Sequence, residues 1–167
     1  ILARWDPEDA EGGTNLYRHK DAHYYMPTED EWVKAGYWNG TELQLHATKP
    51  GEVLHQGDGH TGTGWNYTDS GGAATDPEGP WEVGSGSQEL NGTYDMMGNM
   101  FEWMESPWGD PAYGIGTPRP IRGGSFRDIS LYTYSDWRFT LDDLNPVGGR
   151  IERGFRVAAD VPEPATM

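Results

Sequence analysis

The segment from Thr41 to Gly92 carries no hydrophobic period long enough for a helix, and only brief strand candidates at 42–48 and 81–84. Its strongest local signals are turn-forming dipeptides, among them Pro50-Gly51 and Gly71-Gly72. A structureless stretch of this length inside a compact domain usually has a function or is organised by a bound ion. The remainder of the chain must therefore provide a small core that holds one long loop in place.

The composition indicates a folded, loop-rich chain. The 167 residues include 24 Gly and 12 Pro without a collagen-like period, which favours many turns. Eight Trp, nine Tyr and four Phe argue against disorder, because disordered chains are poor in aromatic side chains. We expect one α+β domain over residues 1–160, with sparse regular structure and small antiparallel sheets. The Pro-rich residues 161–167 are expected to form an extended tail.

One helix has a complete start signal. Thr28 is placed to cap it, Glu29 and Asp30 fall in its first turn, and Glu31 occupies the capping-box position. The pattern predicts a short helix from Glu29 to about Tyr37. The expected strands outside the long loop cover residues 17–25, 121–126, 131–139 and 155–159.

The charge balance narrows the class of partner. With 27 acidic and 12 basic residues, the chain has a net charge of −15. It lacks the basic clusters through which proteins bind nucleic acid, and an anionic membrane surface would repel it. No apolar run is long enough to span a membrane. An acidic surface suits hard cations such as calcium, although solubility alone accounts for the charge equally well.

Four sequence blocks follow one another in a fixed order. They read M-P-T-E-D-E-W at 26–32, Y-D-M-M-G-N-M-F-E-W at 94–103, I-R-G-G-S-F at 121–126 and R-G-F-R-V-A at 153–158. This succession resembles the formylglycine-generating enzyme, or sulfatase-modifying factor, family, whose usual blocks are close to LPTEAEWE, YDMxGNVWEW, RGGSW and GFRxA. The resemblance implies a formylglycine-generating-enzyme-like fold, similar to C-type lectins. Because the family domain is normally longer at its N-terminus, its first strands are expected to be missing or supplied by another chain.

The resemblance implies a calcium site in the second block. Its ligands would be the side chains of Asp95 and Glu102 and the backbone carbonyls of Gly98 and Met100. Two carboxylates, two carbonyls and waters form a donor set that Ca²⁺ prefers. The alternative is a turn before a buried strand, with Glu102 paired to an arginine.

A second calcium site of the family would use Asn66 and Tyr67 together with a more distant acid. Asp76 lies nearest in the sequence, and Asp69 and Glu78 compete with it. The alternative is a Gly-rich surface loop with Asx turns.

The chain has no cysteine, and this absence separates it from the family's chemistry. The family enzyme binds copper(I) through a cysteine pair, and soft thiolates are the ligands that select copper(I). We therefore expect a non-enzymatic protein and assign no catalytic residue. The arginines of the third and fourth blocks are expected to pair with core acids: Arg122, Arg153 and Arg156.

The tail V-P-E-P at 161–164 resembles the opening of a PEP-CTERM sorting signal, which implies an exported bacterial protein at the cell surface. The leading hypothesis is a calcium-bound exported protein that builds or binds extracellular structure, by association with its own copies or with another extracellular chain.

Two alternatives stay open. One is an enzyme of the same fold with cysteine-independent chemistry. The other is a lectin-like module for carbohydrate or protein, since aromatic side chains give contact area at low entropy cost. The candidate contact residues are Trp65, Trp81, Trp108 and Tyr113, although most Trp are expected to fill the core.

Overall fold

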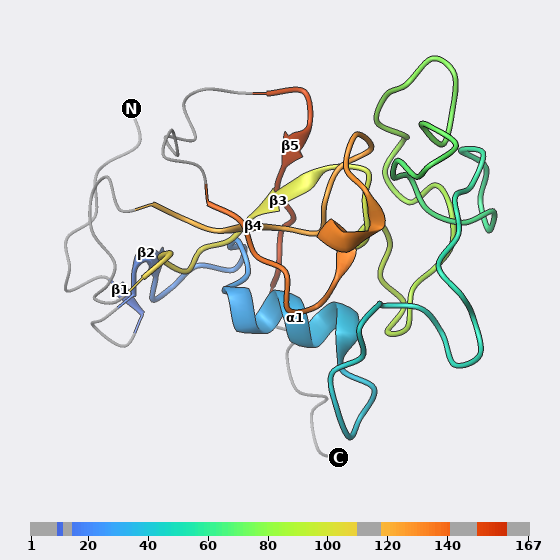
Figure 1. Ribbon diagram of the computed structural model, residues 1–167. Helices are drawn as coiled ribbons and strands as arrows, with labels where there is room; N and C mark the ends of the chain where they lie inside the picture. Colours follow the sequence, from blue (N-terminus) through green and yellow to red (C-terminus); the bar gives the residue numbers. More distant parts are fainter. Residues whose placement is uncertain (1–9, 12–14, 110–117, 141–149, 160–167) are drawn as a thin grey trace.

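A computed structural model describes residues 10–11, 15–109, 118–140 and 150–159. The predicted tail at 161–167 lies outside these residues. Regular structure is sparse, as predicted, and long connections separate the elements (Figure 1). The elements in chain order are β1 (Ala10–Glu11), β2 (Asn15–His19), α1 (Glu29–Tyr37), β3 (Phe101–Trp103), β4 (Ile121–Arg122), the 3-10 helix η2 (Ser130–Thr133) and β5 (Arg153–Gly154). The helix α1, in the described residues, is too short to cross a membrane.

Two small sheets organise the strands. β1 and β2 form an antiparallel pair, and the second sheet has the order β4-β3-β5. Its β3–β4 ladder is antiparallel, with Glu102 opposite Arg122, but β5 runs parallel to β3, with Glu102 opposite Gly154. The expectation of purely antiparallel sheets is therefore wrong for this sheet, because the last block returns to β3 by a long connection rather than a hairpin.

Several strand predictions also differ from the structure. The stretch 131–139 begins with η2 and contributes one bridge, Ile121 to Phe139, instead of a strand. In the stretch 155–159 only Ala158 pairs, with Tyr25. The candidates at 42–48 and 81–84 are not strands either, and Leu43 forms a single bridge to Trp38. In these stretches the described residues form at most isolated bridges, so none of them becomes a ladder of two or more pairs.

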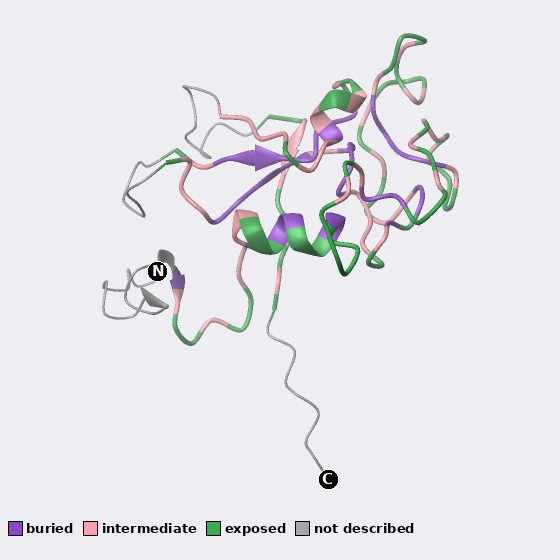
Figure 2. Cartoon of the chain, turned by 60° about the horizontal axis from the view of Figure 1, so that its bottom comes forward, coloured by how far each residue is buried: buried purple, intermediate pink, exposed green. Residues whose placement is uncertain are grey.

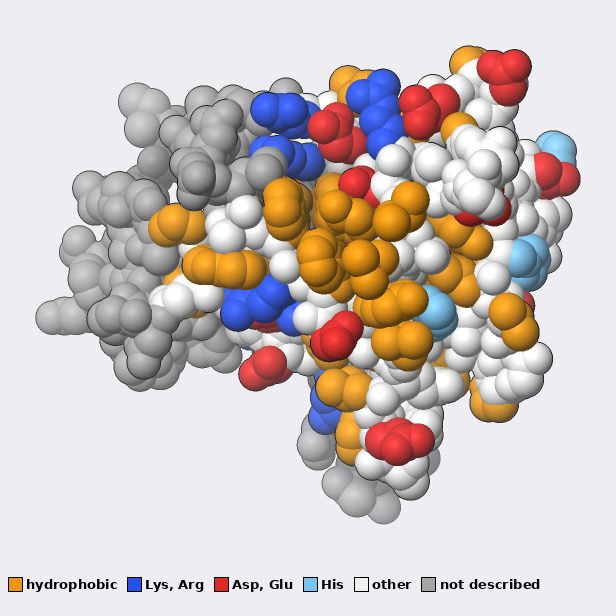
Figure 3. All heavy atoms as spheres, viewed as in Figure 1, with side chains coloured by type: hydrophobic (Ala, Val, Ile, Leu, Met, Phe, Trp, Pro, Cys, Tyr) orange, Lys and Arg blue, Asp and Glu red, His pale blue; other side chains and the backbone are white. Residues whose placement is uncertain are grey.

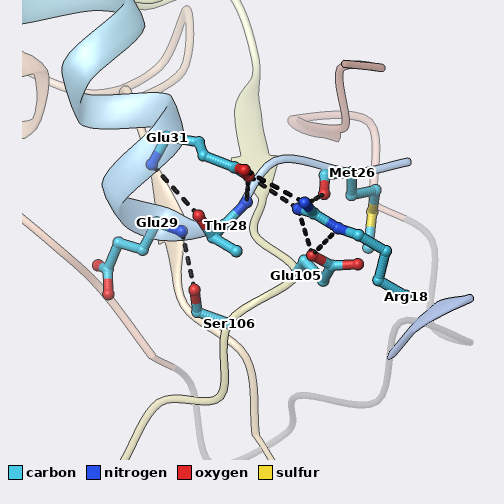
Figure 4. A network of polar contacts seen from close by, with 7 residues as sticks. All are labelled: Arg18, Met26, Thr28, Glu29, Glu31, Glu105 and Ser106. Carbon is cyan, nitrogen blue, oxygen red and sulfur yellow. Dashed lines mark hydrogen bonds and ion pairs between the residues drawn. The ribbon is translucent and has the colours of Figure 1, made fainter. Parts of the chain in front are cut away.

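The helix α1 has the predicted bounds and the predicted cap. The Thr28 hydroxyl accepts a hydrogen bond from the Glu31 N–H, and the Glu31 carboxylate accepts one from the Thr28 N–H at 2.8 Å. The buried Arg18 guanidinium joins this cap to the segment after β3, because it contacts Glu31 at 2.8 Å and Glu105 at 2.6 Å (Figure 4). Charge-assisted bonds of this kind fix the start of α1 against the sheet.

The core lies between α1 and the strands, and the buried side of α1 faces it (Figure 2). One buried cluster consists mostly of aromatic and Met side chains from α1, from the long loop and from residues 96–104: Trp32, Val33, Tyr37, Ala47, Trp65, Tyr67, Met96, Met97 and Met104. A smaller one surrounds β3 and β4: Phe101, Trp103 and Ile121. Large aromatics take the place of the aliphatic side chains that this sequence lacks, as the composition predicts.

Candidate metal centre

A cavity of about 490 Å³ lies between the block at 94–103 and the last block. Three of the four residues expected to bind the first calcium line it, namely Asp95, Met100 and Glu102. The remaining lining residues are Val83, Tyr94, Asn99, Gly154, Phe155, Arg156 and Val157. Gly98 is not among the lining residues, so the structure brings together most of the predicted site but not all of it.

The Asp95 carboxylate is held at the cavity wall by backbone geometry. Asp95 has a φ of 61°, a left-handed conformation that few non-glycine residues adopt. One oxygen accepts a hydrogen bond from the Gly84 N–H at 2.8 Å, and the other accepts a long one from the Asn99 amide at 3.4 Å. Burial raises the pKa of the Asp95 carboxyl, and the charge of Glu102 adds to the rise. A nearby cation would reverse this shift.

Glu102 lies in the buried strand β3 and is paired with an arginine, as the alternative interpretation requires. Its Oε2 accepts from Arg156 Nε at 2.5 Å and from the Trp32 indole N–H at 2.6 Å, and its Oε1 accepts from Arg156 Nη2 at 2.6 Å. Burial alone would lower the pKa of Arg156, but Glu102 raises it above its ordinary value. Because a carboxylate offers about four lone-pair sites, Glu102 keeps one site, on Oε1, for a further partner.

Glu102 fits a hard cation as a monodentate ligand, whereas both oxygens of Asp95 are available to it. Asp95 retains open lone pairs on both oxygens, and Glu102 retains one beside the Arg156 guanidinium. No three His, Asp or Glu side chains converge in the part of the chain that the structure describes. A cation here would therefore draw on two carboxylates, carbonyl oxygen and water, which is within the range of Ca²⁺ coordination.

Gly98 and Asn99 join the block to the long loop. Gly98 has a φ of 81°, and a Cβ atom at this position would stand 2.2 Å from the Asn66 carbonyl oxygen. The Asn99 N–H donates to that same carbonyl at 2.7 Å. The Asn99 amide oxygen accepts from the Trp81 N–H at 2.7 Å and from the Asn66 amide at 3.1 Å. Only glycine allows two backbones this close.

The residues proposed for the second calcium site are placed near one another but are engaged in other bonds. The Asn66 amide donates to the Gly79 carbonyl at 3.0 Å, so Asn66 does meet the stretch that contains Asp76. The Tyr67 carbonyl accepts from the Gln56 amide at 2.6 Å, and Asp76 is exposed. The Gln56 side chain therefore occupies the donor position beside Tyr67 that a cation would take.

The four aromatic residues proposed for ligand contact differ in how far they are buried. Trp65 is 2% exposed and belongs to the core, so it is not available for contact. Trp81 is half-buried, and its backbone N–H is fixed by Asn99. Trp108 is half-buried beneath the Arg138 guanidinium, which lies 4.1 Å from the ring centroid. Tyr113 lies outside the described residues.

The structure adds two residues that sequence reasoning did not assign to the site, and a third, Glu89, that is buried outside the cavity lining. Arg156 was expected to pair with an acid, but its partner Glu102 and its place in the cavity were not predicted. Asn99 could have been found from its position after Gly98, because Asn tolerates a positive φ, and it has one of 60°. Glu89, which is fully buried and accepts a hydrogen bond from Met97 N–H, carries no signal in its local sequence.

Comparisons with known proteins agree with this geometry at the level of fold. A family model described as "Sulfatase-modifying factor enzyme 1-like domain" matches residues 2–161. The solved structure titled "Treponema denticola variable protein 1" is 22% identical with a TM-score of 0.51, over 81% of this chain and 47% of that one. The structure titled "Crystal Structure of CarF" is 24% identical with a TM-score of 0.55, over 83% of this chain and 47% of that one. The chain thus spans about half the length of the solved structures it matches. A search of curated proteins gives no match.

Substituting Gly98 tests the close approach of the two backbones. We expect Gly98→Ala to lower the free energy of unfolding by about 3 kcal/mol or more, because the new Cβ adds a steric clash to the cost of a positive φ. Gly40→Ala is the matched control, since Gly40 also has a positive φ but its Cβ would meet nothing within 4 Å. It should cost only about 1 kcal/mol. Urea unfolding measures both, and equal losses would contradict the proposed contact.

Glu89 gives the protein a defined pH dependence. Burial raises the pKa of this carboxyl from its ordinary 4.5 to about 8, so the folded state binds the proton more tightly than the unfolded state. The stabilisation is fully present below pH 4.5 and is lost as the pH rises through about 8. We expect the free energy of unfolding to fall by up to about 1.4 kcal/mol per pH unit across this window.

Glu89→Gln should remove this dependence, because the amide is neutral throughout and keeps an acceptor for Met97 N–H. The exposed Glu42→Gln is the control and should leave the slope unchanged. Denaturant unfolding at a series of pH values measures the slope, and a Glu89→Gln protein that keeps the original slope would refute the assignment.

Proposed function

The chain belongs to the family of sulfatase-modifying factor enzyme 1-like domains, and from this premise we propose that it is a non-enzymatic domain of an exported protein. In this proposal calcium braces its loops, and the domain builds or binds extracellular structure at the cell surface. The absence of cysteine supports the loss of the family's oxidation chemistry, because no thiolate is present to hold copper(I). The V-P-E-P tail at 161–164 supports export through its likeness to a sorting signal.

The observation that carries the calcium proposal is the cavity shared by Asp95 and Glu102. Two carboxylates line one partly open cavity, and among the described residues Arg156 is the guanidinium that lines it. Burial raises the pKa of Asp95, so a cation bound beside this carboxylate would offset the cost of burying its charge. A divalent cation would be held by Asp95, Glu102 and backbone oxygen of the Gly98–Met100 turn. Its role would be structural, since it would tie the turn before β3 to the last block.

Calcium should raise the melting temperature of the protein. A ligand that binds only the folded state stabilises it, and calcium at about a hundred times its dissociation constant should raise the melting temperature by about 5 to 10 °C. Asp95→Asn should remove most of this rise, whereas the control Asp136→Asn, an exposed acid outside the cavity, should keep it. Differential scanning calorimetry with calcium and with EDTA measures the shift. Identical melting in the two buffers would refute the calcium brace.

Exposed hydrophobic residues along β5 support association between copies of the chain. Among the described strands β5 lies at the edge of its sheet, and Ile151, Phe155 and Val157 beside it are each more than half exposed. An edge strand flanked by exposed apolar side chains favours pairing with another chain. The proposal assigns this edge to a second copy, consistent with a scaffold that builds extracellular structure.

Sedimentation velocity tests this association. We expect the protein to form dimers or larger species as its concentration rises. Ile151→Lys should shift it to a monomer by placing a charge beside this edge and outside the candidate metal centre. Leu45→Lys is the control, because Leu45 is 50% exposed but lies away from β5, beside Ser135. A protein that remains monomeric at every concentration would contradict self-association.

A further inference from the structure

A second cavity, of about 500 Å³, lies beside α1 and does not share a residue with the candidate metal centre. Its walls come from α1, from the turn that follows it and from the segment after η2. The lining residues are Asp30, Val33, Lys34, Trp38, Leu43, Arg122 and Ser135. Hydrophobic side chains gather on the same face of the molecule, over η2 and above α1 (Figure 3). A cavity of this size, with mostly apolar walls and a few polar groups, is typical of a small-molecule site.

The apolar wall is held in shape by backbone bonds. Trp38 and Leu43 form an antiparallel bridge, and the Gln44 N–H donates to the Tyr37 carbonyl at 2.9 Å. The Asn91 amide fixes the end of α1, because it donates to the Trp38 carbonyl at 3.0 Å. Trp38 is 37% exposed and has the most exposed indole of the described tryptophans. These bonds fix the backbone on one side of this open depression, where Trp38 is the exposed aromatic residue.

Three polar side chains in the cavity have no partner among the residues that the structure describes. The Asp30 carboxylate and the Lys34 ammonium lie one helical turn apart, yet they form no ion pair with each other or with another described residue. The Ser135 hydroxyl likewise has no described hydrogen-bond partner, although its backbone bonds to Leu45. Asp30 and Lys34 are exposed to solvent and Ser135 is half-buried, so an acid, an amine and a hydroxyl are accessible to a ligand beside one apolar wall.

The Arg122 side chain also lines the cavity, but its Nε and Nη1 groups already donate to protein acceptors. Its Nε donates to Glu29 at 2.7 Å, and its Nη1 donates to the carbonyls of Ser135 and Trp137 at 2.8 Å. These bonds hold the guanidinium at the cavity wall. Because Glu29 already pairs with this guanidinium, Lys34 is the cation of the lining that is left for an anionic ligand.

We propose that this cavity binds an acidic sugar residue of the uronate type. The carboxylate of such a ring would bond to Lys34, its hydroxyls to Asp30 and Ser135, and its C–H face would lie on Trp38 and Leu43. An aromatic carboxylate would match Lys34 and the indole, but it has no hydroxyl to donate to Asp30. The inference extends the binding part of the proposed function to a new site, and it does not depend on calcium.

Titration of ¹⁵N-labelled protein with methyl β-glucuronide, methyl β-glucoside and benzoate tests the proposal. We expect the glucuronide to shift amides between Asp30 and Leu43 and near Ser135, with a dissociation constant of about 1 mM for a ligand of this size. The glucoside should bind about tenfold more weakly, because it lacks the charge that meets Lys34. Benzoate should bind more weakly than the glucuronide.

Variants separate the contributions of the cavity's groups. Lys34→Gln should abolish the preference for the glucuronide over the glucoside, and Trp38→Ala should weaken both sugars. Lys49→Gln removes a lysine outside the cavity and serves as the matched control, with binding unchanged. Circular dichroism confirms that each variant is folded, and Lys34→Gln alone decides the question if Trp38→Ala does not fold.

Three results would overturn the proposal. The first is an absence of amide shifts with glucuronide at about 20 mM, well above the expected dissociation constant. The second is benzoate binding as tightly as the glucuronide. The third is a Lys34→Gln protein that still prefers the glucuronide to the glucoside. The same titration in EDTA separates this site from the calcium proposal, because sugar binding should persist even if the metal centre is not a calcium site.

Discussion

The contact between Gly98, Asn99 and the Asn66 carbonyl holds the rest of the molecule together. Residues 41–92 contain no helix or strand of their own, so their position depends on the points at which they touch the core. The Asn99 side chain is the main one, since it bonds to Asn66 in the middle of the loop and to Trp81 further along. A buried, fully bonded amide of this kind specifies one arrangement of the loop, because any other arrangement leaves polar groups unpaired.

Around this contact, charge rather than hydrophobic area determines how the blocks meet. Glu102 receives hydrogen bonds from Trp32 of α1 and from Arg156 of the last block, so one carboxylate joins three parts of the chain. Arg18 does the same at the start of α1, where it contacts Glu31 and Glu105. Removing one partner of such a buried pair leaves the other charge unpaired, which typically costs about 3 to 5 kcal/mol. The acidic excess of the chain therefore has structural roles as well as surface ones.

What the sequence could predict follows from how local each feature is. The bounds of α1 were predictable because its cap is formed by Thr28 and Glu31, three residues apart. The four blocks predicted the fold family, and they placed Asp95 and Glu102 at one cavity. The parallel pairing of β5 with β3 was not predictable, because it depends on contacts between residues far apart in the sequence. The Asp30–Lys34–Ser135 cavity was missed for the same reason.

The parallel pairing of β5 with β3 also dictates an order of assembly during folding. Phe101 pairs in the ladder with Arg153, which lies far along the chain, and the ion pair of Glu102 requires Arg156. Loop closure over such a distance is slow, since its entropic cost precedes any gain from contacts. During synthesis from the N-terminus, α1 and its cap can form early. Glu102 has no positively charged partner until Arg156 in the last block packs against it. Completion of the β4-β3-β5 sheet is therefore a late step of folding. The cavity of the candidate metal centre forms only then, because residues 154–157 supply part of its lining.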